Sequence, residues 1–309
     1  METLTLARAA REYHERVVEP TRTEKHGAQW LSSLEHHVPP DLWAAPITSI
    51  TAPQVLDFLI ALRKRIPGTA RRVRPRLETV FEDAIFGGVC TTNPAAATRR
   101  KLRESQGRHE KGQFAALAYP EAPAFLQRVR DAEGLSARCL EFAVLTAART
   151  MEAIGAEWSG VDVEQRLWTI PRERTKAGEP HVVYLSERVL QLLEGQRGLD
   201  KRWLFPSPML DGKLLSNMAM LTLLDRMDAG QRTTVHGLCR ATFSTWACET
   251  NAARPDVIEA CLAHRESDKV KAAYNRAQSA AERRALLAAW AEYLTGNASS
   301  NVIPIAKRA

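Results

Sequence analysis

Residues 161–186 are the stretch of this sequence with β-strand character, and they lie between long segments with helical periodicity. Within the stretch, LWTIP (167–171) and HVVYLS (181–186) are short runs rich in β-branched and aromatic residues, which favour strands. A polar turn containing Gly178 and Pro180 separates the two runs, as in a β-hairpin. One hairpin in an otherwise helical sequence predicts a mainly α-helical fold with a small antiparallel β-sheet.

The order of helical and irregular segments predicts two domains. The first ninety residues repeat apolar side chains at helical spacing, whereas residues 90–118 lose this period and gain Pro, Thr, Arg and Gly, as linkers do. The chain of 309 residues is long enough for two cores. We therefore expect a helical domain over 1–94, a basic linker over 95–114, a larger domain over 115–294 and a weakly structured tail over 295–309.

Composition excludes some classes of protein. Apolar residues make up 45% of the chain and charged residues 26%, which is ordinary for a globular protein. No apolar run approaches the roughly 20 residues that span a bilayer, and the charged N-terminus is unlike a signal peptide. Five scattered cysteines favour reduced buried thiols over a disulfide framework. These features predict a cytoplasmic protein.

Positive charge is concentrated in two runs. Residues 63–76 contain seven Arg or Lys and no acid, and residues 98–111 contain six against two glutamates. Either run alone is typical of a solvated helix face or loop, but two runs flanking one segment favour a groove for nucleic acid. The candidate DNA-binding residues are Arg71, Arg72, Arg74, Arg76, Arg99, Arg100 and Lys101.

Four residues near the C-terminus suit chemistry on a phosphate. His236 and Arg240 are four residues apart, so in a helix they point within about 40° of each other. The planar guanidinium of an arginine pairs two phosphate oxygens and keeps its charge. His264 precedes Tyr274 by ten residues. The set offers a phosphate-binding cation, two groups that move protons and a candidate nucleophile.

Two further candidates lie upstream. Arg149 and Glu152 are three residues apart, so we expect them on one face of a helix. They form either an ordinary surface ion pair or a site in which Glu152 orients the guanidinium of Arg149 toward a phosphate. Lys176 lies in the turn of the expected hairpin. A lysine in a turn is usually solvated, but its reach also lets it enter a minor groove and deliver a proton.

A zinc site is an alternative interpretation of the same segment. His236-x-x-Cys239 and Cys261-x-x-His264 resemble paired zinc ligands. Cys239 lies at the apolar start of a helix, however, and the turns of zinc knuckles are missing. Buried thiols account for both cysteines, so we expect no metal.

Arranged along the chain, the six candidates are Arg149, Lys176, His236, Arg240, His264 and Tyr274. This is the order used by the tyrosine recombinases, the phage integrase family, and the chain resembles that family. The segments AARTMEAIGAEW, HGLCRATFSTWACE and AAYNRA are similar to the prophage and genomic-island branch. WLSSLEHHV and ITAPQVL resemble that family's core-binding, SAM-like domain. The resemblance covers about residues 1–290, and it implies a helical core-binding domain followed by a tyrosine-recombinase catalytic domain.

The resemblance also implies a mechanism for site-specific recombination. Tyr274 would attack a phosphate of duplex DNA, forming a 3′-phosphotyrosyl enzyme and a free 5′-hydroxyl. Arg149 and Arg240 would neutralise the charge that builds on the phosphate oxygens. The covalent bond conserves the energy of the phosphodiester, so no cofactor is expected.

Four residues would assist this reaction in the family's pattern. Lys176 would protonate the leaving 5′ oxygen, and His236 would act as the base near the tyrosine. His264 would donate a hydrogen bond to a phosphate oxygen, and Glu152 would support the site.

The partners implied are double-stranded DNA at attachment sites, accessory DNA-bending proteins and further copies of the chain in a homotetramer. The C-terminal helix has an apolar face with Leu286, Leu287, Trp290 and Leu294. That face is explained by packing in the domain's own core or by docking on a neighbouring protomer, and the tetramer interpretation uses the second explanation.

Two departures from the family's pattern leave alternatives open. The family spaces its histidine and second arginine as H-x-x-R, whereas here three residues separate His236 from Arg240. Both spacings keep one helix face, at about −60° and +40°. The sequence also begins at the core-binding part, without the small arm-binding domain common in this branch. These departures make a DNA-binding remnant with weakened catalysis an alternative function. A type IB topoisomerase, which shares the chemistry but relaxes supercoils as a monomer, is a further alternative.

Overall fold

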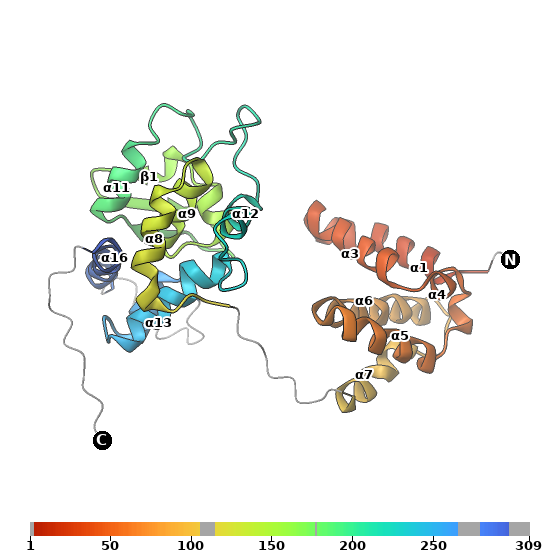
Figure 1. Ribbon diagram of the computed structural model, residues 1–309. Helices are drawn as coiled ribbons and strands as arrows, with labels where there is room; N and C mark the ends of the chain where they lie inside the picture. The colour runs from red at the N-terminus through yellow and green to blue at the C-terminus, as the bar shows by residue number, and fades with distance from the viewer. Residues whose placement is uncertain (1–2, 106–114, 177, 265–278, 297–309) are drawn as a thin grey trace, which may run out of the picture. The chain divides into compact units, whose positions relative to one another are not determined.

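The computed structural model describes residues 3–105, 115–176, 178–264 and 279–296. The chain divides into two compact units, residues 1–112 and 113–309, and each is described by itself (Figure 1). Helices dominate both, and the only sheet in the described ranges is three-stranded and antiparallel. This is the mainly α-helical fold with a small sheet that the sequence predicted.

The first unit is entirely helical in its described part. Its elements are α1 (Leu6–Tyr13), η1 (His14–Val18), α2 (Glu19–Thr21), α3 (Glu24–His37), α4 (Pro40–Ala44), η2 (Ile47–Ser49), α5 (Ala52–Arg65), α6 (Pro67–Phe86) and α7 (Pro94–Glu104). Thr51 caps α5 in a capping box with Gln54, whose side chain accepts from the Thr51 amide at 2.9 Å. Helices α5, α6 and α7 pack together around Leu59, Val73 and Ala95, which are buried.

Helix α7 occupies the segment where the sequence predicted the start of a linker. Residues 94–104 are helical because Asn93 caps the helix, with its side chain accepting from the Ala96 amide, and Pro94 fits the first turn. Ala95 and Thr98 are buried against the first unit. The buried face of this helix is short and made of small residues, so it carries little apolar signal in the sequence. The first unit extends beyond residue 94.

The second unit holds the sheet and the remaining helices. Its elements are η3 (Tyr119–Glu121), α8 (Ala122–Asp131), α9 (Leu135–Thr146), α10 (Thr150–Ile154), η4 (Trp158–Gly160), β1 (Val161–Asp162), β2 (Leu167–Ile170), η5 (Arg172–Arg174), β3 (His181–Tyr184), α11 (Glu187–Glu194), α12 (Ala219–Arg226), η6 (Gly237–Ala241), α13 (Thr242–Glu249), α14 (Pro255–Cys261) and α16 (Ala280–Thr295). The strands follow one another in the order β1-β2-β3. Strands β2 and β3 form the predicted hairpin, with Leu167 opposite Tyr184 and Ile170 opposite His181.

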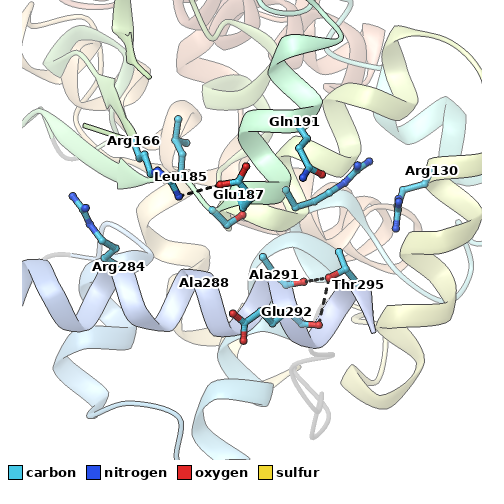
Figure 2. Close-up of a pocket in the computed structure, with 12 residues that line it drawn as sticks. Arg130, Arg166, Leu185, Glu187, Gln191, Arg284, Ala288, Ala291, Glu292 and Thr295 are labelled. Atoms are coloured by element: carbon cyan, nitrogen blue, oxygen red, sulfur yellow. Dashed lines mark hydrogen bonds and ion pairs between the residues drawn. The ribbon is translucent and has the colours of Figure 1, made fainter. Parts of the chain in front are cut away.

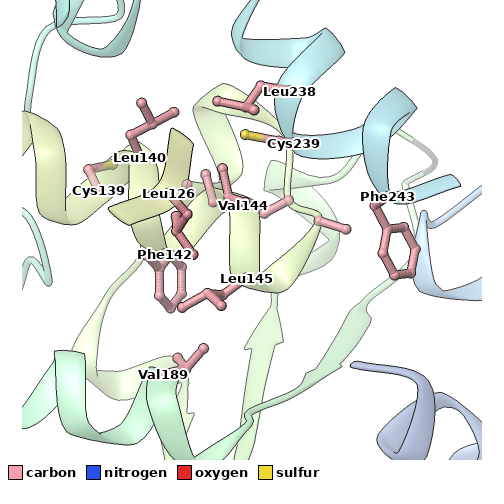
Figure 3. Packing of buried hydrophobic residues seen from close by; sticks show 14 of the residues in the cluster. Leu126, Cys139, Leu140, Phe142, Val144, Leu145, Val189, Leu238, Cys239 and Phe243 are labelled. Carbon is pink, nitrogen blue, oxygen red and sulfur yellow. The ribbon is translucent and has the colours of Figure 1, made fainter. Parts of the chain in front are cut away.

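Helix α9 is the centre of the second unit. Nine of its twelve residues are buried, so it lacks the polar face of a surface helix. Figure 3 shows Phe142 and Leu145 of α9 directed toward Val189 of α11, whereas Leu140 of the same helix points the other way. The ring of Phe142 meets that of Trp168 from β2 edge-on at 4.9 Å between centroids. This packing joins the sheet to the helices that carry the site.

The apolar face of α16 packs inside the second unit. Leu286, Leu287, Trp290 and Leu294 are all at most 2% exposed and belong to the unit's core. The indole of Trp290 lies 4.9 Å from that of Trp246 and donates to the carbonyl of Val144. Of the two explanations for this face, packing in the domain's own core is therefore the one that the structure confirms. Residues 297–309 lie outside the described part.

Membrane insertion has no support among the described helices. None of them is both long enough and apolar enough to cross a bilayer.

Candidate active site

Arg149 lies at the N-cap of α10, immediately after the buried helix α9. Ala147 ends α9 in the left-handed conformation, with φ of 51°, and this turn delivers Arg149 to the surface of the core. Glu152 is 4% exposed; its carboxylate accepts from the Arg149 amide at 2.9 Å and from Nη1 at 2.8 Å. The pair expected on one helix face exists, but Arg149 precedes the helix instead of belonging to it.

Arg240 is the most buried cation of the site. Only 3% of it is exposed; its Nη1 donates to the carbonyl of Ala147 at 2.8 Å, and its Nη2 donates to the carbonyl of Leu262. Burial, with the nearby charge of Arg149, lowers the pKa of Arg240 to about 10, so the side chain stays charged at neutral pH. Its Nε is buried without a partner among the described residues. That donor suits an anion.

The two arginines share one frame of backbone carbonyls. Nη2 of Arg149 lies 3.3 Å from the carbonyls of both Leu262 and Ala263, and Arg240 uses Leu262 as well. The partial negative charge of these carbonyl oxygens offsets the repulsion between the two guanidinium groups, so the groups can lie close together. The end of α14 therefore positions both cations.

His264 follows this frame and contacts Arg240. Its Nδ1 lies 2.5 Å from a carboxylate oxygen of Glu259, and its Nε2 lies 3.0 Å from Nη2 of Arg240. A carboxylate accepts and a guanidinium donates, so we assign the proton to Nδ1 and the lone pair to Nε2. In this state Nε2 faces the arginine as an acceptor.

A π turn joins His236 to Arg240. Residues Gly237–Ala241 form η6, in which each turn holds one residue more than an α-helical turn. His236 and Arg240 therefore stay on one side of the helix despite three intervening residues. Gly237 permits this arrangement, since a Cβ there would lie 2.1 Å from the carbonyl oxygen of Ala115.

The charges around His236 show which candidates the fold brings together. Burial lowers the pKa of His236, and Arg240, Arg149, His264 and Lys176 all lower it further. Lys176 itself is exposed, in the turn between β2 and β3. Five of the six predicted catalytic residues thus share one neighbourhood. The sixth, Tyr274, lies outside the described residues.

The zinc alternative has no geometric support. Within the described ranges no three His, Cys, Asp or Glu side chains are grouped to hold a metal ion. Cys239 and Cys261 are buried, and burial raises their pKa values to about 12 and about 11, so both stay protonated. His264 is turned toward Arg240 and Glu259.

Family models and relatives cover both units. Residues 6–101 match the phage integrase central domain and residues 117–281 match the phage integrase family. Prophage integrase IntZ of Escherichia coli K12 is 32% identical over 286 residues, which cover 92% of this chain and 69% of that protein. The integrase of Enterobacteria phage P4 is 27% identical, with 95% and 70% covered. The chain belongs to the phage integrase family.

Solved structures agree on the fold of this integrase. A lambda integrase fragment, residues 75–356, solved as a dimer bound to a COC′ core site, has a TM-score of 0.67 at 18% identity and covers 89% of this chain and 97% of that one. The Tn1549 transposon integrase has a TM-score of 0.62 at 14% identity, covering 88% and 99%. With its family, the chain is a tyrosine site-specific recombinase. The type IB topoisomerase alternative is thereby set aside.

Sequence reasoning missed several residues that build the integrase site. Glu259 orients His264, and the carbonyls of Leu262 and Ala263 hold the arginines. Glu259 precedes His264 by five residues, a spacing with no helical meaning, and a backbone carbonyl leaves no trace in the choice of side chain. Nothing in the sequence singles these groups out.

The predicted DNA-binding arginines of the first unit fall into two groups. Arg74 and Arg99 both pair with Glu78, which is 9% exposed; burial would raise the pKa of Glu78, but the two guanidinium groups lower it overall. Arg76 donates to the carbonyls of Gln29 and Trp30, at 3.0 and 3.3 Å. These three arginines brace the helices of the unit.

The remaining members of the set are exposed, as is Arg99 despite its pairing with Glu78. Arg71 and Arg72 lie on α6, while Arg100 and Lys101 of α7 pair with Glu104 at 2.8 and 3.0 Å. Arg71 also lines a hollow of about 240 Å³, together with two arginines that the sequence did not single out, Arg63 and Arg103. The exposed arginines are the ones available to a partner.

A larger pocket of the integrase lies away from the catalytic candidates. Figure 2 shows this hollow of about 670 Å³ between α11 and α16, with Arg166 paired to Glu187 at its rim. Glu141 beneath it is fully buried and pairs with Arg130 and Arg188. Arg130, Arg166 and Arg188 are therefore engaged with acids of the same unit, whereas Arg284 donates to the carbonyl of Gln165 at 3.3 Å. None of the five candidates that the structure describes lines this pocket.

His181 makes the stability of the second unit depend on pH. Burial, and after it the charge of Arg283, lowers the pKa of His181 to about 4, against 6.5 for a free side chain. As pH falls from about 6.5 to 4, the unfolded chain binds a proton that the folded chain refuses. We expect the free energy of unfolding to fall by about 3 kcal/mol across this window.

Urea denaturation of the integrase and of its His181→Gln variant at several pH values between 7 and 4 measures this effect. The variant lacks the titrating ring, so its loss of stability between pH 6.5 and 4 is expected to be smaller than that of the unmodified chain. Equal losses in both proteins would assign the acid sensitivity to other groups.

Proposed function

We propose that this integrase cuts duplex DNA at a specific site by forming a 3′-phosphotyrosyl bond to Tyr274, and then rejoins the ends in a new pairing. The observation that carries the proposal is the convergence of Arg149, Arg240, His236, His264 and Lys176 on one neighbourhood. One buried and one partly buried cation, held by a shared carbonyl frame, favour a site that binds a phosphodiester.

The arginines supply most of the catalytic effect in this proposal. Charge builds on the non-bridging oxygens as the tyrosine attacks, and preorganised guanidinium groups stabilise it without having to move. The unpartnered Nε of Arg240 is a donor ready for such an oxygen. Glu152 keeps Arg149 in place by accepting from both its backbone amide and its side chain.

The histidines and the lysine move protons. The lowered pKa of His236 keeps its ring neutral near pH 7, as a base accepting the tyrosine proton requires. Lys176 protonates the leaving 5′ oxygen. His264 contacts a phosphate oxygen through Nε2, in exchange for its present contact with Arg240.

DNA and further copies of the chain are the proposed partners. Lambda integrase, a protein of the same fold, was solved as a dimer on a core site and as a tetramer on a Holliday junction. In the first unit, Arg71, Arg72, Arg99, Arg100 and Lys101 are the exposed cations from the predicted set, and Arg103 joins them. Such charges contact the DNA backbone irrespective of sequence.

A suicide substrate tests the proposal. Direct repeats in the DNA that flanks the gene supply the candidate site, and a nick beside the cleavage position lets the short cut strand diffuse away before it can be rejoined. We expect a protein–DNA adduct that survives denaturation, with the DNA on the peptide containing Tyr274 by mass spectrometry. Specific binding without an adduct would instead support the DNA-binding remnant.

A further inference from the structure

Arg174 ties the lysine turn to the helix that follows Arg149. It lies two residues before Lys176, at the end of η5, and its Nη2 donates to the carbonyl of Met151 in α10 at 2.9 Å. Helix α10 begins directly after Arg149. One short helix therefore connects a phosphate-binding cation at its start to the lysine turn through Arg174.

Gly155 makes this contact possible. A Cβ at residue 155 would lie 1.5 Å from Nη2 of Arg174 and 2.4 Å from its Cζ, so the guanidinium occupies the place of a side chain. The backbone of Gly155, with φ of −100°, is one that any residue adopts. The glycine therefore leaves the space that the Arg174 guanidinium occupies at the end of α10, and a side chain here would have to displace it.

The turn that carries Lys176 is closed at its base. The hydroxyl of Thr175 donates to the carbonyl of Glu179 at 2.8 Å, and the amide of Gly178 donates to the carbonyl of Thr175 at 3.3 Å. These bonds join the two sides of the turn next to Lys176. The direction of the turn then depends on the strands and on the anchor at Arg174.

We propose that Arg174 is a positioning residue for Lys176, holding the lysine turn against α10 so that the ammonium group meets the leaving oxygen while Arg149 holds the phosphate. The inference rests on the proposed function, which gives Lys176 the role of the acid. Removing the anchor leaves Glu157, the acid nearest Arg174, still paired with Arg202 at 3.1 Å. The loss is expected to fall on the placement of the turn and to spare the fold.

The chemistry of the leaving group separates placement from other effects. As the Tyr274 oxygen forms its bond to phosphorus, the bond from phosphorus to the 5′ oxygen breaks, and that oxygen takes a proton from Lys176. If sulfur replaces the 5′ oxygen, the leaving thiolate is stable without a proton, because thiols have a pKa of about 8.5. The sulfur substrate therefore needs no acid.

Rates of adduct formation on the two substrates test the proposal. On ordinary DNA we expect Arg174→Ala to slow adduct formation about a hundredfold, the usual effect of misplacing a reacting group by about 1 Å. On the sulfur substrate both Arg174→Ala and Lys176→Ala are expected to return to near the unmodified rate. Arg174→Lys, which keeps a donor for Met151, is expected to recover part of the loss on ordinary DNA.

Two further variants sharpen the comparison. Gly155→Ala keeps every polar group but displaces Arg174. We therefore expect it to slow adduct formation on ordinary DNA and to leave the rate on the sulfur substrate unchanged. The double variant Gly155→Ala, Arg174→Ala is expected to form the adduct no more slowly than Arg174→Ala alone, because the guanidinium that would clash with the alanine is gone. Arg172→Ala is the matched control, because Arg172 is exposed in the same segment and its ion pair with Glu173 is 4.0 Å long. It is expected to react normally.

The possible failures are distinguishable. If the unmodified chain forms no adduct with either substrate, the proposed function fails and this inference with it. If sulfur does not rescue Lys176→Ala, the lysine is not the acid and Arg174 has no acid to position. If sulfur rescues Lys176→Ala but Arg174→Ala stays slow on both substrates, the inference alone is wrong.

Discussion

Tyr274→Phe is expected to bind the attachment site as tightly as the unmodified integrase and to form no covalent adduct. The substitution removes one oxygen atom, which is the proposed attacking atom, and leaves the arginines that bind the phosphate. Electrophoresis under denaturing conditions with a labelled suicide substrate measures the adduct, and a binding titration measures affinity. The expected result is full occupancy with complete loss of the shifted band.

Tyr293→Phe is the matched control for this variant. Tyr293 lies in α16, where its hydroxyl donates to the carbonyl of Tyr119 at 3.1 Å within the folded unit. Its loss is expected to leave the adduct in place. If Tyr274→Phe still formed an adduct, the nucleophile would be another residue, and peptide mapping of that adduct would identify it.

Arg240→Lys is expected to slow adduct formation by about a hundredfold to a thousandfold, the effect of removing one preorganised donor from a developing anion. Lysine keeps the charge but loses the planar fork that spans Ala147 and Leu262. Single-turnover rates with saturating protein measure the chemical step apart from binding. Arg240→Met removes the charge as well and is expected to be slower still.

Folding must be measured beside these rates, because Arg240 also satisfies buried carbonyls. Each carbonyl left without a donor costs about 1–3 kcal/mol, so Arg240→Met is expected to unfold at lower urea concentration. Arg232→Lys is a suitable control, since Arg232 is about half exposed and pairs with Glu121. If Arg240→Lys is folded and reacts at the unmodified rate, Arg240 does not stabilise the transition state.

The sequence predicted the parts of this fold that depend on local pattern. The hairpin of β2 and β3 followed from alternating β-branched residues around Gly178, whose φ is 70°. The order of the candidates, matched to that of the family, predicted a set of which the structure brings five residues into one neighbourhood. Helix α7 escaped because its buried positions are small residues, Ala95 and Thr98, which give little apolar signal.

Tertiary partners were beyond the reach of spacing. Arg76 belongs to the same basic run as Arg71, yet it donates to backbone carbonyls more than forty residues earlier in the chain. Arg240 and Ala147 are 93 residues apart and bond through a carbonyl that every residue type possesses. A one-dimensional pattern locates charges on a helix face but does not say whether that face meets solvent, protein or DNA.

The π turn at Gly237–Ala241 has a consequence for how such enzymes are recognised. An extra residue widens one turn while the helix beyond it keeps its phase, so Phe243 and Trp246 still point into the core. A single-residue insertion between two candidate catalytic positions is thereby absorbed locally. A search that demands a fixed number of residues between His236 and Arg240 would discard this chain as defective. Comparing the faces that the residues occupy would retain it.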